Sequence, residues 1–510
     1  MTGRPSPTRH FQVASFSEAT FFSMISSPMV TTAQAASHRR ARYLYEYLKT
    51  LSAQTVVAES MYTDAAYLDD YAHFYVKSFA EYKRQCLRLH FFSTSFSQGD
   101  FENWAIGSGA VEPLQAGYLG FVVIRPLPEA IIGRTVLRTY PPDGGRRHYP
   151  VRASYEAHVF GLTLEVESLP FQEQDTVLAA CATVALWSAF QQCARRFSTS
   201  APSPAEITAM ATTAEVRSRA LPSRGLTLGQ MCRAIKAIGL EPEVFSCSAS
   251  TPLNSLLHAY VSWGLPAILL VDVGKQGHAI TLAGYSLRAA RCLTREDMVP
   301  ASPDVRRVGL RIDEWYGHDD QVGPFAHVFV KEHADPEDPN APLIAFEGSW
   351  KEATGEYVRL VPKHVIIPVY HKIRVTFLDI QQWITAFNRL AAQVISNFDE
   401  LEWDVRLTTT NEVKEAMRRQ APSEARNRIL LSPAPRFMWR AVLQTPSHPA
   451  AELLFDATDM ARSYPFVDVL FHDDNFRTNL KGITHHPELD GVLGELVTPQ
   501  FRDFLRDRTE

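Results

Sequence analysis

Hydrophobic positions in the first third of the chain recur at helical spacing and then at strand spacing. Between residues 37 and 90, aromatic and leucine residues stand three or four positions apart, which predicts amphipathic helices. Between 117 and 165, apolar and polar residues alternate in short runs that Pro141–Gly145 interrupts, which predicts strands and tight turns. We therefore expect residues 1–165 to form a helical and then β-rich N-terminal region.

The central part of the chain, 166–370, changes to helices followed by strands. Apolar positions predict helices at 181–193, 227–239 and 252–264, and glycines end the second and third of them. A series of short runs rich in branched residues follows as far as 370 and predicts strands. This order indicates an α+β domain.

The last part of the chain, 371–510, again mixes the two patterns. Helical spacing is present at 379–398 and 411–420, and strand-like apolar runs follow between 436 and 473. No catalytic motif is apparent in this part. We interpret it as a C-terminal α+β domain and a candidate for regulation or for binding a protein partner.

Composition and charge narrow the class of protein. The chain has 510 residues, of which 45% are hydrophobic and 21% charged, as is typical of folded multidomain proteins. The 51 basic and 56 acidic residues leave a net charge of −5, so bulk electrostatics recruits neither nucleic acid nor an anionic membrane. No apolar run approaches the roughly 18 residues of a membrane-spanning helix. We expect a cytoplasmic protein.

The cysteine pattern argues against disulfides and structural zinc. The six cysteines are scattered and include no CxxC pair. Two His-Asp-Asp strings, 318–320 and 472–474, lack the spaced histidines of a metal site. We therefore predict neither a metal nor an organic cofactor.

Three fragments carry side chains suited to nucleophilic catalysis. QEQDTVLAAC ends on Cys181 at the start of a predicted helix, LPAILLVDVGKQGHAITLAGY places His278 at the start of a predicted strand, and RIDEWYGHDDQVGPF places Asp319 after the next strand. A thiolate attacks a carbonyl, an imidazole transfers the proton, and a carboxylate orients the imidazole. A helix N-terminus also favours the thiolate form of a cysteine. These residues are the predicted nucleophile, base and orienting acid.

In this order, the fragments resemble the papain-like fold, and within it the peptidases that process bacteriocin leaders at double-glycine sites. The resemblance covers about residues 165–370 and rests on a glutamine before Cys181, on Gly277–His278 followed by Gly284–Tyr285, and on an aspartate four residues before Gly323. It implies a thioester intermediate and a glutamine side chain that stabilises the oxyanion.

The sequence departs from that family pattern near the cysteine. Ala182 stands where the relatives carry glycine or serine. The position six residues before the cysteine, where the relatives have the oxyanion glutamine, is Asp175. Gln174 is therefore our candidate for the oxyanion role, and Gln172 is the alternative.

A second departure lies between the histidine and the acid. The segment 286–307 is inserted between the two strands and lengthens the spacing. Asp320 and Asp313 are accordingly alternatives to Asp319.

The function that these observations indicate is cysteine-dependent acyl hydrolysis. We expect a papain-like endopeptidase that acts on a protein or peptide substrate. A transglutaminase or glutamine deamidase uses the same three residues, and a catalytically silent papain-like binding module has the same fold. Both alternatives stay open at this point.

Overall fold

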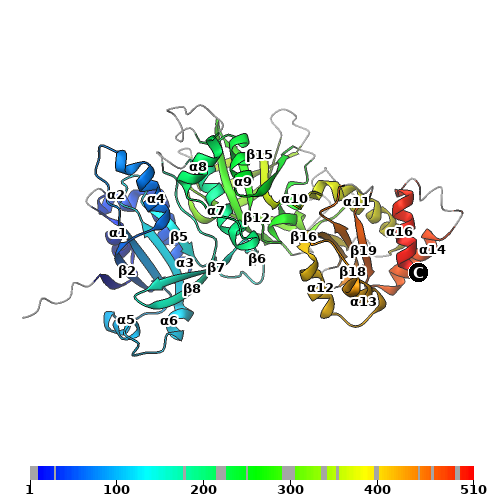
Figure 1. The fold of residues 1–510 in the computed structure, drawn as a ribbon, viewed down its shortest axis with the longest axis horizontal. Coiled ribbons are helices and arrows are strands. Elements are labelled where there is room, and N and C mark those ends of the chain that lie inside the picture. Colours follow the sequence, from blue (N-terminus) through cyan, green and yellow to red (C-terminus); the bar gives the residue numbers. More distant parts are fainter. Residues whose placement is uncertain are drawn as a thin grey trace, which may run out of the picture.

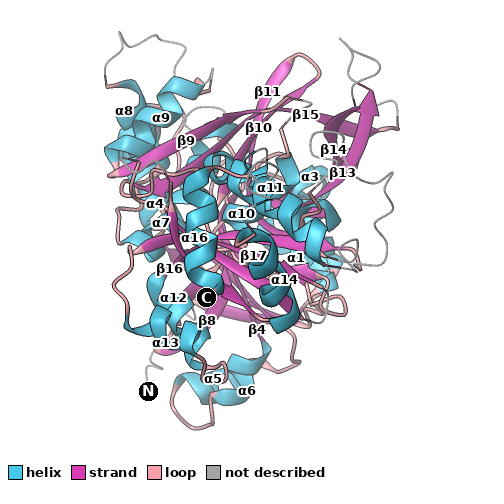
Figure 2. Ribbon diagram, turned by 90° about the vertical axis from the view of Figure 1, so that its right-hand side faces the viewer, coloured by secondary structure: helices cyan, strands magenta, loops and turns pink. Residues whose placement is uncertain are grey.

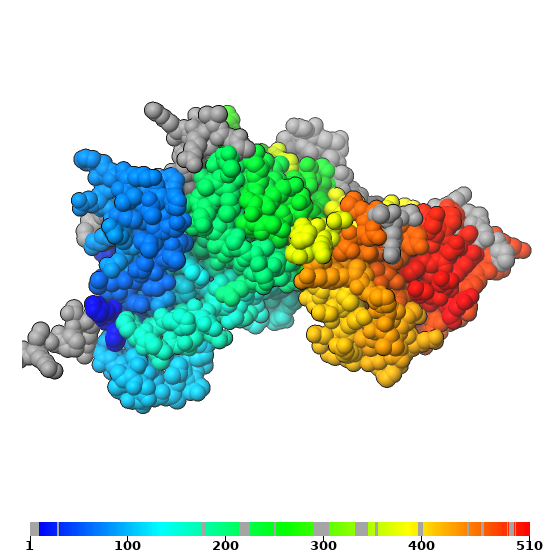
Figure 3. All heavy atoms as spheres, in the orientation of Figure 1, coloured from blue at the N-terminus to red at the C-terminus, as the bar shows by residue number. Residues whose placement is uncertain are grey.

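The chain folds into three regions that follow one another along the molecule (Figure 1). The computed structural model describes residues 10–510 apart from 28–29, 176–179, 214–224, 249–250, 290–304, 335–341, 352–354, 396–400, 446–447, 461–463, 487, 489–493 and 495. The space-filling view shows the N-terminal region packed directly against the central region, and the C-terminal region packed against its other side (Figure 3). No helix among the described residues is long and apolar enough to cross a membrane.

The N-terminal region is built on an antiparallel sheet of five strands whose spatial order follows the sequence. The strands are β1 (Phe11–Ser15), β2 (Thr55–Tyr62), β3 (Cys86–Phe92), β4 (Tyr118–Ile124) and β5 (Ile132–Leu137). The helices around it are α1 (Glu18–Ile25), α2 (Thr32–Ser37), α3 (Arg39–Thr50), α4 (Ala65–His73), η1 (Tyr75–Lys77), α5 (Gln98–Ala105) and α6 (Glu112–Gly117).

The prediction of helices between 37 and 90 is correct for α3 and α4 and wrong for β2 and the start of β3. Strand β3 is covered on both faces, so nearly every one of its side chains is buried. A strand buried in this way shows no alternation of apolar and polar residues, and its pattern is indistinguishable from that of a buried helix.

The strand prediction for 117–165 is confirmed by β4, β5 and the hairpin of β7 (Ala153–Val159) and β8 (Leu162–Ser168). Phe160 and Gly161 form the turn with φ angles of 47° and 87°, the left-handed geometry of a tight hairpin. Buried and exposed side chains alternate along β8, and the buried face packs against β4 and β5. The chain leads from this hairpin directly into the central region.

The central region contains a closed antiparallel barrel of six strands, because the first strand, β10, also pairs with the last, β15. The strands are β10 (Ala267–Val273), β11 (Gln276–Leu287), β12 (Ile312–Asp319), β13 (Gly323–Ala334), β14 (Pro342–Lys351) and β15 (Tyr357–Tyr370). Strand β9 (Leu240–Ser246) extends the sheet beside β15, and the short β6 (Arg147–His148) pairs with β11. This mixed architecture confirms the α+β class.

Among the described residues, the helices that precede or interrupt these strands are α7 (Cys181–Phe197), α8 (Pro204–Thr212), α9 (Leu228–Ala237), α10 (Leu253–Val261) and the short η4 (Val308–Arg311). The three helices predicted for this region correspond to α7, α9 and α10. Helix α7 lies against β11, where the hydroxyl of Thr281 donates to the carbonyl of Ala185 at 2.8 Å. Figure 2 shows α8 and α9 together at one side of the molecule, next to β9.

The C-terminal region is a four-stranded antiparallel sheet with helices packed on it. The strands, in spatial order, are β16 (Glu402–Thr409), β17 (Phe437–Gln444), β18 (Pro449–Asp456) and β19 (Phe466–Phe471). The helices are α11 (Phe377–Val394), α12 (Thr410–Arg418), α13 (Glu424–Leu431), α14 (Asp474–Thr484) and α16 (Pro499–Thr509).

The C-terminal region shares a hydrophobic core with the central region. Tyr260 of α10 packs edge-on against Trp439 of β17, with ring centroids 5.2 Å apart. The indole of Trp263 donates to Glu412 at 2.7 Å, and the guanidinium of Arg196 lies 3.7 Å from the centre of that indole. Buried aromatic contacts of this kind join the two regions as one packed body.

Candidate active site

Cys181 is the first residue of α7, and its side chain is half-buried. Ala180 occupies the cap position and offers no side-chain acceptor to the first turn of the helix. The backbone amides of this turn thus have no side-chain cap, and their positive potential favours a negative charge near the start of the helix. Leu186 and Phe190 are fully buried on the same helix and fix it against the barrel. This packing holds the thiol in a constant position.

His278 lies near the start of β11, where it pairs with Val271 of β10. Its side chain is buried, and its Nε2 lies 3.0 Å from Oδ1 of Asp319. The side chain of Cys181 lies near enough to His278 to raise its pKa. The other ring nitrogen, Nδ1, is buried and has no hydrogen-bond partner among the described residues. Catalytic hydrogen bonds are often long in free enzymes.

Asp319 ends β12, and its side chain is 0% exposed. Its Oδ1 accepts from the backbone N–H of Gln321 at 2.9 Å as well as from His278. The backbone N–H of Val322 donates to the carbonyl of Asp319, which closes the turn to β13. The carboxylate is thus fixed by its own turn while it faces the imidazole.

The surroundings of His278 favour the cationic form of its imidazole. Burial by itself lowers its pKa, but the charge of Asp319, the hydrogen bond to Asp319, the nearby thiol of Cys181 and the charge of Asp320 together raise the pKa well above 6.5. A cationic imidazole beside a thiol is the partner that a thiolate needs. The structure brings the three predicted residues Cys181, His278 and Asp319 together.

The two alternative acids lie in different surroundings. Asp320 is also buried, and its Oδ1 lies 3.8 Å from Nε2 of His278, beyond hydrogen-bond distance. Burial raises the pKa of Asp320 to about 7. Asp313 stands at the opposite end of β12, is partly exposed and pairs with Arg146 at 2.8 Å. Asp319 is the acid that is hydrogen-bonded to the imidazole.

The two candidate glutamines lie on the segment that leads to α7. Gln174 is half-buried, whereas Gln172 is 3% exposed, and its Nε2 has no hydrogen-bond partner among the described residues. Residues 176–179, which join this segment to the nucleophile helix, lie outside the described residues. Both amides stay candidates for the oxyanion role.

Glu173 lies between these two glutamines, and the sequence did not predict it as a residue of the site. Its side chain is 0% exposed, and burial raises its pKa to about 7 despite the nearby Arg40 and Arg125. Arg40 lies 3.6 Å from it, although more than a hundred residues separate the two in the chain. No local pattern marks such a pair, so only the fold brings them together.

One group of described side chains has the composition of a metal site. Donor atoms of His278, Asp319 and Asp320 lie within 4.8 Å of one another. One imidazole nitrogen and two carboxylates are ligands for a divalent transition metal. Nε2 of His278 and Oδ1 of Asp319 also form the hydrogen bond that orients the imidazole. The same side chains would therefore serve as ligands in a metal site and as base and orienting acid in thiol chemistry.

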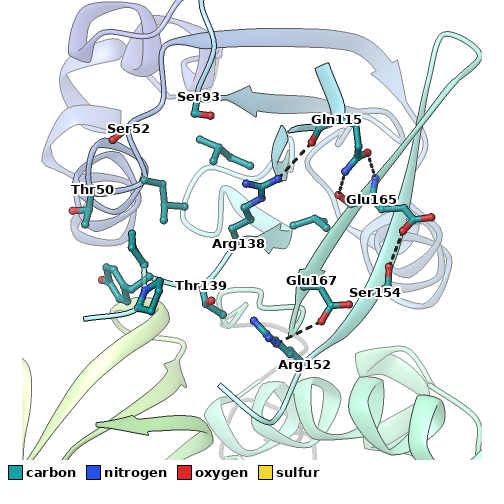
Figure 4. Close-up of a pocket in the computed structure, with 16 residues that line it drawn as sticks. Thr50, Ser52, Ser93, Gln115, Arg138, Thr139, Arg152, Ser154, Glu165 and Glu167 are labelled. Carbon is teal, nitrogen blue, oxygen red and sulfur yellow. Dashed lines mark hydrogen bonds and ion pairs between the residues drawn. The ribbon is translucent and has the colours of Figure 1, made fainter. Parts of the chain in front are cut away.

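A cavity of about 590 Å³ lies away from these residues, between the five-stranded sheet and the β7–β8 hairpin (Figure 4). Its polar side chains largely satisfy one another. The side-chain amide of Gln115 bonds to both backbone groups of Glu165, at 2.8 and 2.9 Å, and Arg152 pairs with Glu167 at 3.5 Å. None of its lining residues belongs to the candidate site.

Comparison with known proteins does not assign this chain to a family. No protein-family model matches the chain, and a search of the curated proteins finds no match. The functional assignment therefore depends on the residues themselves.

Proposed function

We propose that the protein is a cysteine-dependent acyl hydrolase, and specifically an endopeptidase of papain-like type that acts on a protein or peptide. The observation that carries this proposal is the position of His278 between Cys181 and Asp319. The order of the elements supports it, because a helix that begins at the nucleophile precedes the antiparallel strands that carry the base and the acid.

In the proposed reaction, the thiolate of Cys181 attacks the carbonyl carbon of the scissile bond. The C–N bond breaks, and the imidazolium of His278 gives its proton to the leaving amine. A water molecule then attacks the thioester, His278 accepts its proton, and the proton returns to the thiol as the carboxylic acid leaves. Asp319 orients the ring and stabilises its charge throughout.

The negative oxygen that develops in each step needs hydrogen-bond donors. We propose the backbone N–H of Cys181 and the side-chain amide of Gln174 for this role, with Gln172 as the alternative. Gln172 has in its favour that its buried Nε2 is unpaired among the described residues, since an unsatisfied buried donor is costly unless a ligand uses it.

The test is incubation of the protein with an unbiased peptide library, followed by mass spectrometry. We expect new termini with the wild type and none with Cys181→Ala or His278→Ala. The substitution Cys193→Ala is the matched control, because Cys193 lies on the same helix, is fully buried and has a pKa that burial raises. It should leave the cleavage pattern unchanged.

The same experiment separates the rival functions. Addition of a primary amine and a glutamine-containing peptide should give no cross-link if the enzyme is a peptidase. An amine adduct, or conversion of glutamine to glutamate, would instead identify a transglutaminase or a deamidase. Failure of Cys181 to react with an electrophilic thiol probe would identify a silent binding module and overturn the proposal.

A further inference from the structure

Helix α3 of the N-terminal region contacts the turn that carries the orienting acid. The guanidinium of Arg40 donates through Nε to the carbonyl of Asp320 at 2.6 Å. Arg39 donates through two nitrogens to the carbonyl of Gln321, at 2.6 and 2.9 Å. The two arginines thus bind consecutive carbonyl groups immediately after Asp319.

The packing beneath these hydrogen bonds is close. The hydroxyl of Tyr43 donates to the carbonyl of Pro324 at 3.0 Å. A Cβ added at Gly323 would lie 2.2 Å from the ring of Tyr43, so a larger residue cannot occupy this position without a shift of one partner. The turn 319–324 is therefore seated on α3, an element of a different region of the fold.

Arg40 also reaches the other loop of the site, the segment before α7. Its Nε lies 3.6 Å from Oε2 of Glu173. The other carboxylate oxygen of Glu173 accepts from the backbone N–H of Ile132 at 2.8 Å, and Arg125 donates to the carbonyl of Glu173 at 3.2 Å. One guanidinium therefore connects the segment that precedes the nucleophile with the turn that follows the acid.

The charges around the imidazole form one cluster contributed by six parts of the chain. Arg40 is the cation that faces both Glu173 and Asp320, and it lowers the pKa of each carboxyl against the opposing effect of burial. The remaining members are Cys181 from α7, His278 from β11, Asp319 from β12, Arg39 and His38 from the start of α3, and Arg125 from the turn after β4.

We propose that Arg40 is a positioning residue of the active site, which fixes the turn that carries the orienting acid Asp319 against the segment before the nucleophile. This inference rests on the proposed function, since it assigns a role within the same site. It makes the N-terminal region a constituent of the active site.

The consequence of removing this charge has a definite sign. Without Arg40, the turn that carries Asp319 loses its hydrogen bond at the carbonyl of Asp320 and its connection to Glu173, so Asp319 holds the imidazole of His278 less firmly. A weaker ion pair between Asp319 and His278 stabilises the thiolate–imidazolium pair less, so less of Cys181 is thiolate at neutral and acidic pH. At alkaline pH the thiol ionises without the help of the imidazolium, and the loss disappears.

The test is the rate of iodoacetamide labelling at Cys181, measured by peptide mass spectrometry from pH 5 to 9 on the full chain. For Arg40→Gln we expect the acid side of the profile to move up by about one pH unit, which is about tenfold slower labelling near pH 6 and little change above pH 8.5. Arg40→Lys keeps the charge but loses the planar guanidinium, and it should give an intermediate profile.

Arg42→Gln is the matched control, because Arg42 lies on the same helix and pairs with the exposed Glu18 instead. Its profile should equal that of the wild type. Coincidence of the Arg40→Gln and Arg42→Gln profiles, or a loss by the same factor at every pH, would overturn the inference and leave the proposed function standing. Should Arg40→Gln not fold, an Arg40→Lys profile identical to wild type would overturn it equally.

Failure of the proposed function has a different signature. Wild-type Cys181 would then label no faster than Cys193 at neutral pH, and both proposals would fall together.

Discussion

Replacement of Asp319 by asparagine removes the charge that faces His278 and keeps the shape of the side chain. Oδ1 of Asp319 accepts from the imidazole at 3.0 Å and from the backbone N–H of Gln321 at 2.9 Å. The equivalent change at the next residue, Asp320→Asn, removes a charge 3.8 Å from the same ring nitrogen. The pair of variants therefore compares two acids at nearly equal distance from one base.

Coulomb's law alone barely separates the two acids. At an effective dielectric constant of about 20, the attraction is about 5 kcal/mol at the shorter distance and about 4 kcal/mol at the longer one. The hydrogen bond from His278 to Asp319 therefore decides the difference between the two acids. A hydrogen bond to a charged group contributes roughly 1.5–3 kcal/mol, which changes the population of the ion pair by about 10-fold to 150-fold. Asp320 makes no such bond, and its pKa of about 7 leaves it only partly ionised at pH 7.

We therefore expect Asp319→Asn to lower the rate of iodoacetamide labelling at Cys181 by about 10-fold to 100-fold at pH 7. Asp320→Asn should lower it by less than about threefold, because this carboxyl is partly neutral already. Asp313→Asn serves as the third arm and should have no effect, since that side chain pairs with Arg146. A larger loss in Asp320→Asn than in Asp319→Asn would show that the hydrogen bond does not identify the orienting acid.

Two further outcomes follow from the same cluster. Dialysis against EDTA should leave labelling of Cys181 and peptide cleavage unchanged, and loss of cleavage that added zinc or manganese restores would assign His278, Asp319 and Asp320 to a metal instead. In the folded state the pKa of Glu173 is about 7, above its ordinary value of 4.5. Between pH 4.5 and 7 the folded protein therefore keeps a proton on Glu173 that the unfolded chain loses. The free energy of unfolding consequently falls as the pH rises through this window. This residue accounts for up to about 3 kcal/mol of that fall. Glu173→Gln should therefore lose less thermal stability than wild type between pH 5 and 8, and equal losses in thermal unfolding would contradict the assignment.

Local patterns predict those parts of the fold that have one buried and one exposed face. The alternation along β8 and the glycines after α9 and α10 are visible in the sequence because solvent on one side imposes a period on the side chains. Strand β3 is buried on both faces, so its apolar run carries no such period and predicts a helix wrongly. The periodicity of apolar residues reflects the exposure of one face of an element to solvent. It therefore gives no signal for an element that is buried on both faces.

The residues of the candidate site also differ in how far the sequence alone predicts them. Cys181 and His278 could be chosen from the sequence, since one begins an apolar helical run and the other stands between a glycine and a strand. The choice between Asp319, Asp320 and Asp313 required the distance of each carboxylate from His278. All three are aspartates on one strand and its turn, so the sequence alone does not distinguish them. The link from Arg40 to Glu173 and Asp320 depends on the packing of α3 against two distant loops. The sequence determined which chemical groups are available, and tertiary packing decided which of them meet, because electrostatic interactions depend on distance and burial, which residue order does not encode locally.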